Sequence, residues 1–300
     1  MKSAKDSAKI MAEASWFAAL PPPLRAHVPA FLGVRETANG PGYALEYLYL
    51  PTLADLHVFG RLSTGAWTRI FDACDEFLGA CASYPAPDTA AEHATGLYLD
   101  KAPQRLARFA REAGVSITAP CRFNGRALPS LLRMAEIAAQ AIPPADPTSH
   151  LHLMHGDFCF SNILYDARAS LVRVIDPRGV AADGTVTPYG DIRYDLAKLY
   201  HSVVGRYDHI LAGYYRLTQD GPTDVTLELR NEKALRDIEA LFMARPFAGM
   251  LPLESASHAI CILLFLSMLP LHADDIRRQC ALMANAMRLF STLDAGGTIA

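Results

Sequence analysis

Three polar residues near the middle of the chain have the types and the spacing that phosphoryl transfer requires. Asp157 and Asn162 lie five residues apart between short apolar segments, and Asp176 follows the run 171–175, which is apolar except for Arg173. Phosphoryl transfer needs a carboxylate near the attacking hydroxyl and oxygen ligands for the magnesium ion that bridges the phosphates. An amide oxygen such as that of Asn162 binds Mg²⁺ without adding charge that repels a nucleotide. The pattern predicts Asp157 as the catalytic carboxylate and Asn162 and Asp176 as metal ligands.

The sequence around these residues resembles the aminoglycoside phosphotransferase and choline kinase superfamily, a branch of the protein-kinase-like fold. Its catalytic loop reads H-G-D-x-x-x-x-N, and His155, Gly156, Asp157 and Asn162 match it position by position. The metal-binding aspartate of the family follows an apolar strand, as Asp176 does. Motifs that are weak singly make a strong signal when they occur in the right order. The resemblance implies that Asp157 orients or deprotonates an acceptor hydroxyl, with ATP or GTP and Mg²⁺ as cofactors.

Two further residues receive supporting roles from the resemblance. The segment containing Asp195-Leu196-Ala197 is similar to the D-L-A element of the family, whose aspartate bonds backbone amides of the catalytic loop. We therefore expect Asp195 to brace that loop, although a carboxylate near a helix N-terminus is favoured in any case. His155 is expected to bond the backbone and orient the aspartate rather than to move protons.

The phosphate-binding lysine is expected near the start of the sequence. Lys2 resembles the lysine that contacts the α- and β-phosphates in the family, and Glu13 resembles the glutamate that holds it; Lys5 and Lys9 are alternatives for the lysine. In the family, two strands and a glycine-rich turn precede this lysine, and this sequence has no room for them before Lys2. The resemblance therefore implies a reduced nucleotide-binding lobe.

Residues 44–48 resemble the hinge between the two lobes of the family. Backbone groups of Glu46 and Leu48 would then meet the adenine base. The hinge marks the expected division of the chain, into a reduced nucleotide-binding lobe over residues 1–50 and a helical lobe over residues 51–300 that carries the catalytic loop and the acceptor site.

The acceptor is expected to be a small hydroxyl compound, either sugar-like or an amino alcohol. The runs H-G-D-F-C-F-S-N and I-D-P-R-G resemble phosphotransferase domains found beside capsule and surface-polysaccharide genes. Arg178 stands two residues after Asp176, and a guanidinium there is suited to bind a phosphate or carboxylate of the acceptor.

Two other function classes compete with this interpretation. His150, His152 and His155 are closely spaced, and alternating histidines on a strand can bind one metal ion, as in zinc hydrolases. That hypothesis leaves Asn162 and Asp176 unexplained. The second alternative is a kinase-fold binding module that is catalytically impaired because the glycine-rich turn is missing.

The elements that must position these residues form an α+β pattern. Apolar residues recur every three or four positions in several segments, as on one face of a helix, and short alternating or apolar runs favour strands. The expected helices are residues 5–20, 64–82, 101–113 and 127–142, and the expected strands are residues 43–50, 150–154, 163–165 and 171–175. Beyond residue 190 the pattern indicates helices to the end. We expect a protein-kinase-like two-lobed fold with a mainly helical second lobe.

The composition limits the partners and the compartment. With 28 basic and 31 acidic residues the net charge is −3, whereas nucleic-acid binders normally carry a basic excess. The longest apolar run, residues 259–271, falls short of the ~20 residues of a membrane span, so a buried helix is expected. Six scattered cysteines favour free thiols in a reducing compartment, and the polar start is unlike a secretory signal, so we expect a cytoplasmic protein. The sequence leaves an oligomer open.

Overall fold

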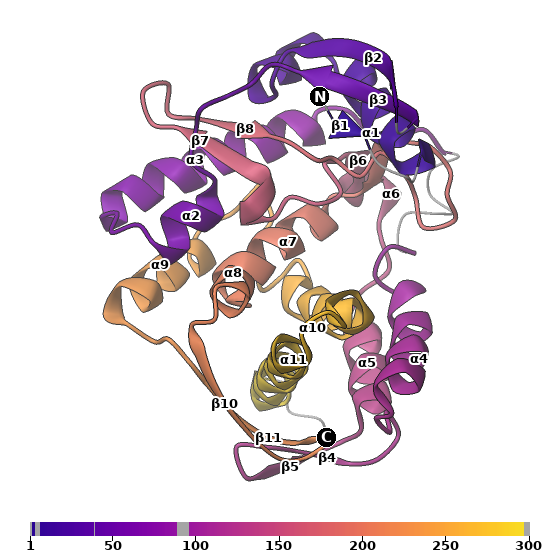
Figure 1. Ribbon diagram of the computed structural model, residues 1–300. Helices are drawn as coiled ribbons and strands as arrows, with labels where there is room; N and C mark the ends of the chain where they lie inside the picture. Colours follow the sequence, from indigo (N-terminus) through magenta and orange to yellow (C-terminus); the bar gives the residue numbers. More distant parts are fainter. Residues whose placement is uncertain (1, 4–6, 39, 89–95, 297–300) are drawn as a thin grey trace.

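The computed structural model describes residues 2–3, 7–38, 40–88 and 96–296. It has the expected mixed architecture, with a small sheet and one long helix in the N-terminal part and a mainly helical C-terminal part (Figure 1). The N-terminal elements are β1 (Lys2–Ser3), α1 (Ser7–Ala19), the 3₁₀ helix η1 (Pro22–His27), β2 (Phe31–Thr37) and β3 (Gly40–Leu45).

The N-terminal sheet is antiparallel throughout, with the strand order β1-β3-β2. Helix α1 packs on it through aromatic side chains. Phe17 stacks on Phe31 of β2 with 6.1 Å between ring centroids and meets Tyr43 of β3 at 5.7 Å. These residues are largely withdrawn from water, so their burial fixes α1 against one face of the sheet. Tri-proline 21–23 ends α1, as the sequence predicts.

Two β-ribbons flank the catalytic loop. The elements are β6 (Leu151–Leu153), β7 (Ile163–Asp166), β8 (Leu171–Val174) and β9 (Tyr189–Asp191), with the short 3₁₀ helix η3 (Phe160–Asn162) before β7. Strand β6 pairs with β9, and β7 pairs with β8 so that Ile163 lies opposite Val174. The catalytic loop therefore leaves one ribbon and enters the other.

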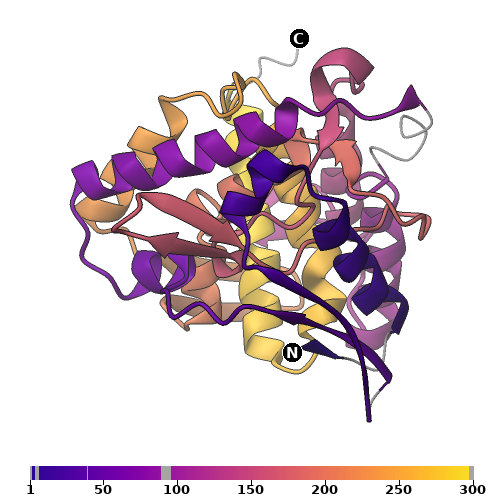
Figure 2. The same cartoon turned by 90° about the horizontal axis from the view of Figure 1, so that it is seen from above.

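The helical part is built around a buried helix. Its members are α2 (Leu53–Val58), α3 (Thr64–Ala82), α4 (Lys101–Ala113), α5 (Leu131–Gln140), α6 (Pro147–His150), α7 (Arg193–Val203), α8 (Tyr207–Leu211), α9 (Lys233–Met243), α10 (Ser257–Met268), η4 (Leu269–His272) and α11 (Ile276–Gly296). Apart from His258, every residue of α10 is buried, and α4, α5, α7 and α11 pack around it. Figure 2 shows the yellow C-terminal helices in the middle of the molecule. The apolar run is thus a buried helix, as predicted.

Among the described residues, no helix is both long and apolar enough to cross a membrane. The six cysteines are free thiols.

The expectation of helices alone beyond residue 190 was wrong. A four-stranded sheet of order β10-β11-β4-β5 lies at the end of the molecule far from the N-terminal sheet (Figure 1). Its strands are β4 (Cys121–Phe123), β5 (Arg126–Leu128), β10 (Tyr215–Gly221) and β11 (Asp224–Leu229). Two boundaries also differ from the prediction: the strand expected over residues 43–50 is β3, which ends at Leu45, and the helix expected over 127–142 is α5, whose first turn is preceded by β5.

Candidate active site

The catalytic loop folds so that Asn162 holds Asp157. The amide nitrogen Nδ2 of Asn162 donates to the backbone carbonyl of Asp157 at 2.9 Å and to its carboxylate Oδ2 at 3.1 Å. Because both donors of the amide point to Asp157, the oxygen Oδ1 faces away and has no hydrogen-bond partner among the described residues. That oxygen is suited to a magnesium ion, which prefers oxygen ligands.

The β7–β8 ribbon brings Asp176 beside Asn162. The N–H of Ile175 donates to the backbone carbonyl of Asn162 at 3.0 Å, and Asp176 follows directly. Asp176 has a φ of 58°, in the left-handed region that aspartate tolerates better than most residues. Residues held in such conformations cluster at functional sites. The three residues that the sequence singled out thus lie at one place in the fold, and the donor set of Asn162 and Asp176 fits Mg²⁺ bound to a nucleotide.

Lys198 contacts the carboxylate of Asp157 and was missed in the sequence. Its Nζ lies 2.7 Å from Oδ1 of Asp157, and its side chain is only 12% exposed. Burial alone would raise the pKa of Asp157, but the positive charges of Lys198 and Arg178 hold it well below its usual range. The signal was the spacing: Lys198 is one turn after Asp195 on α7, so both face the catalytic loop.

Asp195 accepts hydrogen bonds from the backbone of the catalytic loop. The N–H groups of His155 and Gly156 donate to its two carboxylate oxygens at 2.6 and 2.8 Å, and the side chain is fully buried. Burial raises the pKa of Asp195 to about 7, against the opposing effect of these two N–H groups, which favour the charged form. This is the position that the bracing role requires.

His155 ties the loop to the segment of Asp176. Its Nδ1 accepts from the N–H of Asp157 at 3.2 Å, which leaves Nε2 to donate to the carbonyl of Ile175 at 3.0 Å. Burial lowers the pKa of His155 to about 4, so the ring is neutral near pH 7. A neutral ring with both nitrogens bonded orients its neighbours and has no lone pair to spare for proton transfer.

Arg178 lies on the other side of the loop. Its Nε donates to the carbonyl of Gly156 at 3.0 Å and an NH2 group donates to the hydroxyl of Tyr194 at 3.3 Å. Gly156 has a φ of 77°, and a Cβ there would lie 2.7 Å from Cβ of Arg178. The loop therefore needs glycine at this position both for its conformation and for space.

Glu13 is buried between α1 and the N-terminal sheet. The Tyr43 hydroxyl donates to its Oε2 at 2.7 Å, and Nζ of Lys9 lies 3.8 Å from Oε1. The backbone of Lys2 pairs with that of Tyr43 in the sheet, which brings β1 next to α1. The side chain of Lys2 and all of Lys5 lie outside the described residues.

The expected hinge follows β3. The N–H of Glu46 donates to the carbonyl of Ala30 at 2.9 Å, and the Ala30 N–H donates to Oε2 of Glu46 at 3.2 Å. Because the N–H of Glu46 already donates to Ala30, it is not available to a nucleotide base. A base bound here would have to use the carbonyl of Glu46 or the backbone of Leu48, a half-buried residue.

A cavity of about 240 Å³ opens at Asp157. It is bounded by α4, α7, the end of α10 and η4, and it includes Asn162 but not Asp176. Asp157 therefore borders a cavity of a size suited to a small acceptor, and Asp176 lies outside that cavity.

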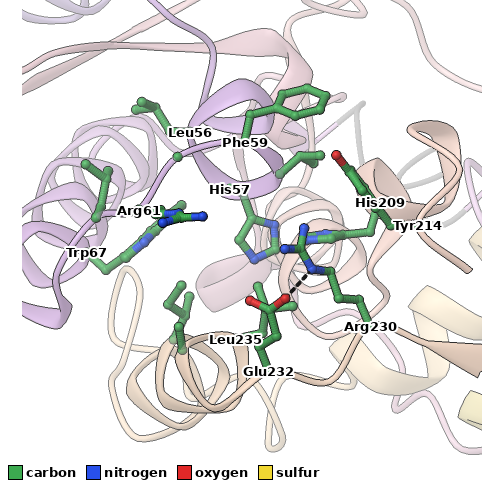
Figure 3. A pocket seen from close by; sticks show the side chains of 15 residues that line it. Leu56, His57, Phe59, Arg61, Trp67, His209, Tyr214, Arg230, Glu232 and Leu235 are labelled. Carbon is green, nitrogen blue, oxygen red and sulfur yellow. Dashed lines mark hydrogen bonds and ion pairs between the residues drawn. The ribbon is translucent and has the colours of Figure 1, made fainter.

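A larger cavity, of about 560 Å³, lies elsewhere, between α2, α8 and α9 (Figure 3). Figure 3 shows the rings of His57 and His209 side by side, with Arg230 paired to Glu232 at 2.6 Å. Burial lowers the pKa of both histidines, so they are uncharged near pH 7. None of Asp157, Asn162 or Asp176 lines this cavity, so its size alone does not make it the site of chemistry.

The alternative metal site of three histidines does not form. Nδ1 of His150 accepts from the N–H of Asp146 at 2.9 Å, His155 is bonded as described above, and His152 is buried on β6. Across the described part of the chain, no group of three or more His, Cys, Asp or Glu side chains is arranged to hold a metal ion. The zinc-hydrolase hypothesis therefore has no geometric support, whereas a kinase site draws most of its metal ligands from the phosphates.

Comparison with known proteins identifies a family for the chain. Residues 2–225 match the model of the phosphotransferase enzyme family. A crystal structure of a candidate aminoglycoside phosphotransferase from Ralstonia eutropha JMP134 has 15% sequence identity and a TM-score of 0.48, covering 97% of this chain and 82% of the other. No curated protein sequence matches the chain. On the strength of the family match, which spans most of its length, the chain belongs to the phosphotransferase enzyme family.

Proposed function

We propose that the protein is a magnesium-dependent small-molecule kinase that transfers the γ-phosphate of ATP or GTP to a hydroxyl group. The observation that carries the proposal is the hydrogen bonding of Asn162 to Asp157 together with the backbone pairing that brings Asp176 beside Asn162. A carboxylate next to two oxygen ligands for Mg²⁺ is the set of protein groups that phosphoryl transfer needs.

Asp157 orients the acceptor hydroxyl in this proposal. Because the pKa of Asp157 is held low by Lys198 and Arg178, its carboxylate is a weak base near pH 7. Asp157 would contribute by holding the acceptor hydroxyl next to the phosphate, because an oriented hydroxyl lowers the entropic cost of the reaction. Because Lys198 lies 2.7 Å from Asp157, its positive charge would also stabilise negative charge that develops beside Asp157 in the transition state.

Oδ1 of Asn162 and the carboxylate of Asp176 would hold Mg²⁺, which neutralises the phosphates when it is bound. Lys2, held by Glu13, would contact the α- and β-phosphates, and the backbone at Glu46 and Leu48 would meet the base. Support for this arrangement comes from the burial of Glu13 under the Tyr43 hydroxyl next to the strand of Lys2.

The test is a screen for acceptor-dependent ADP release by the full chain. Sugars, sugar derivatives and amino alcohols form the panel, with sugars first because residues 155–162 resemble polysaccharide-associated phosphotransferases. We expect release with at least one acceptor, and an Asp157→Asn variant that is folded, with a kcat lower by at least about 10²-fold. Wild-type turnover by that variant would remove Asp157 from the mechanism.

A further inference from the structure

The cavity at Asp157 is lined by more basic than acidic side chains. Two of its cations, Lys101 and Arg105, come from α4, and two others, Arg178 and Lys198, come from the catalytic segment and α7. Asp157 is the sole carboxylate among the described residues that line it, and Lys198 already pairs with it. The wall therefore carries a net positive charge facing the place where an acceptor would lie.

Few interactions within the fold stabilise the positive charges of Lys101 and Arg105. They stand four residues apart on one face of α4, where like charges destabilise a helix. Arg105 donates to the carbonyl of Ser267 at 3.4 Å, and within the described ranges neither residue has a carboxylate partner. On the exposed face of the same helix, Arg108 instead pairs with Glu112 at 2.7 Å.

The unfavourable effect of burying these positive charges is clearest at Lys101. Burial, with the charges of Arg178 and Arg105 adding to it, lowers the pKa of Lys101 to about 8. A half-buried cation that its surroundings destabilise needs an anion to offset the loss of water. The charged side chains that line the cavity with Lys101 are positive except Asp157, so a bound anion would offset the cost of burying Lys101.

We propose that Lys101 and Arg105 form an anion-binding subsite of the acceptor site, so that the acceptor is a small hydroxyl compound carrying a phosphate or carboxylate group. The inference rests on the proposed kinase function and names its substrate class. With the reactive hydroxyl at Asp157, the anionic group of the same molecule reaches α4 across the cavity.

The shape of the cavity agrees with such an acceptor. Its volume of about 240 Å³ lies below the range of drug-sized ligands, which favours a compound of monosaccharide size. Its lining also includes the apolar side chains of Leu264, Met268 and Leu271, which suit the carbon face of a sugar ring. A polycationic acceptor such as an aminoglycoside would be repelled by the same cations.

The test measures binding of inorganic phosphate to the full chain by isothermal titration in the presence of saturating MgADP. We expect binding by the wild type and by Arg111→Gln, a control that removes one positive charge from the exposed face of α4, as Lys101→Gln does from the cavity. The double variant Lys101→Gln/Arg105→Gln should bind about 100-fold more weakly, because two charge-assisted contacts are lost. Equal affinity in all three proteins, or no binding by the wild type, would overturn the subsite.

Two further variants test whether weaker binding by the double variant comes only from the loss of the hydrogen bond between Arg105 and Ser267. Lys101→Gln alone changes a side chain that makes no hydrogen bond or ion pair with the described residues, and it should still weaken phosphate binding about 10-fold. Arg105→Lys, which keeps the charge, should bind phosphate nearly as well as the wild type. Weaker binding by Arg105→Lys than by Lys101→Gln would contradict a role based on charge.

Matched sugars separate the two sources of the anion and separate this inference from the kinase proposal. Glucose 6-phosphate and glucuronate should each bind better than glucose, and the tighter of the two identifies a phosphate or a carboxylate. Glucosamine, a cation of the same size, should bind least. Failure of MgADP to bind would count against the kinase proposal, whereas tighter binding of glucose or glucosamine than of both anions would count against the subsite alone.

Discussion

Asp157 is held on three sides, and each contact restricts what it can do. Lys198 contacts one carboxylate oxygen, Asn162 the other, and the backbone N–H of Asp157 donates to His155. A carboxylate fixed in this way stays ionised and keeps one orientation. At the scale of single residues, the site is therefore built for positioning rather than for strong basicity.

Lys198→Gln tests this interpretation through pH. Removing the lysine leaves Arg178 as the main charge that opposes the effect of burial, so the pKa of Asp157 rises and loss of activity on the acid side should begin at higher pH than in the wild type. Lys233→Gln, which removes an exposed lysine paired with Asp237 on α9, serves as the control and should leave the profile unchanged. The measurement is kcat/KM against pH for the three proteins. An acid limb at the same pH in wild type and Lys198→Gln would contradict the role of Lys198.

Helix α4 supplies the second pH effect. Lys101 has a pKa of about 8 in the folded protein, so its positive charge disappears as pH rises through that value. We expect kcat/KM for the acceptor to fall above about pH 8, and Lys101→Arg, whose guanidinium stays charged, to remove this fall. The charged and titratable groups that line the cavity with Lys101 are Arg105, Arg178, Lys198, Asp157, Cys159, Tyr194, Tyr207 and His272.

The same helix makes a separate prediction about stability. In the unfolded chain Lys101 has its ordinary pKa of 10.5, so between about pH 8 and 10.5 the unfolded state binds more protons than the folded state. Stability contributed by this group therefore rises with pH across that window, and at pH 7 the charged lysine is unfavourable. Lys101→Gln should not lower the melting temperature at pH 7, although it weakens acceptor binding. A clear drop would indicate a structural role for Lys101.

At the scale of elements, the sequence correctly predicted the helices whose apolar pattern lies wholly within the helix itself. Helices α3 and α4 have the predicted bounds because their apolar stripes are long and regular. Strands β4 and β5 pair with each other across Asn124-Gly125, whose positive φ values of 49° and 78° are typical of a two-residue hairpin turn, so a local signal for them was present and was missed. Only their place in the sheet, where β4 pairs with β11, depends on a distant segment. Strands β10 and β11 did have a signal, since Leu217, Val225 and Leu227 alternate with polar residues around a turn containing Gly221.

Some residues of the candidate site could be predicted from the sequence and others could not. Asp157, Asn162, Asp176 and Asp195 could be found because they belong to motifs of fixed spacing. The two cations of α4 could not, because nothing in their own segment shows that they face a cavity shared with the catalytic loop. Sites assembled from distant elements become visible only when the elements are packed together.

At the scale of the whole molecule, α1 joins the N-terminal sheet to the catalytic loop. Its Trp16 donates a buried hydrogen bond to the carbonyl of Met154 at 2.8 Å, and its Glu13 accepts from Tyr43. The loop after Asp176 also touches α1, because a Cβ on Gly179 would run into the backbone carbonyl of Ala12. Movement of α1 would therefore disturb the sheet and the site together.

Gly179→Ala tests this coupling, with Gly184→Ala as a matched control. Both glycines have positive φ, 63° and 95°, so both substitutions cost about 1–2 kcal/mol in backbone conformation. A Cβ at Gly184 meets no atom within 4 Å, whereas one at Gly179 displaces α1. Gly179→Ala should have the lower melting temperature and the weaker MgATP affinity. Equal effects of the two substitutions would show that the contact with α1 is unimportant.

The most direct test of the central claim is isothermal titration of the full chain with ATP in the presence and absence of Mg²⁺. We predict that the wild type binds ATP in a magnesium-dependent way, that Asp157→Asn binds MgATP similarly, and that Asp176→Asn binds at least about 10-fold more weakly with little dependence on Mg²⁺. A folded wild-type protein that gives no heat with MgATP would contradict the account and favour a non-catalytic binding module. Unchanged magnesium-dependent binding by Asp176→Asn would remove Asp176 as a metal ligand.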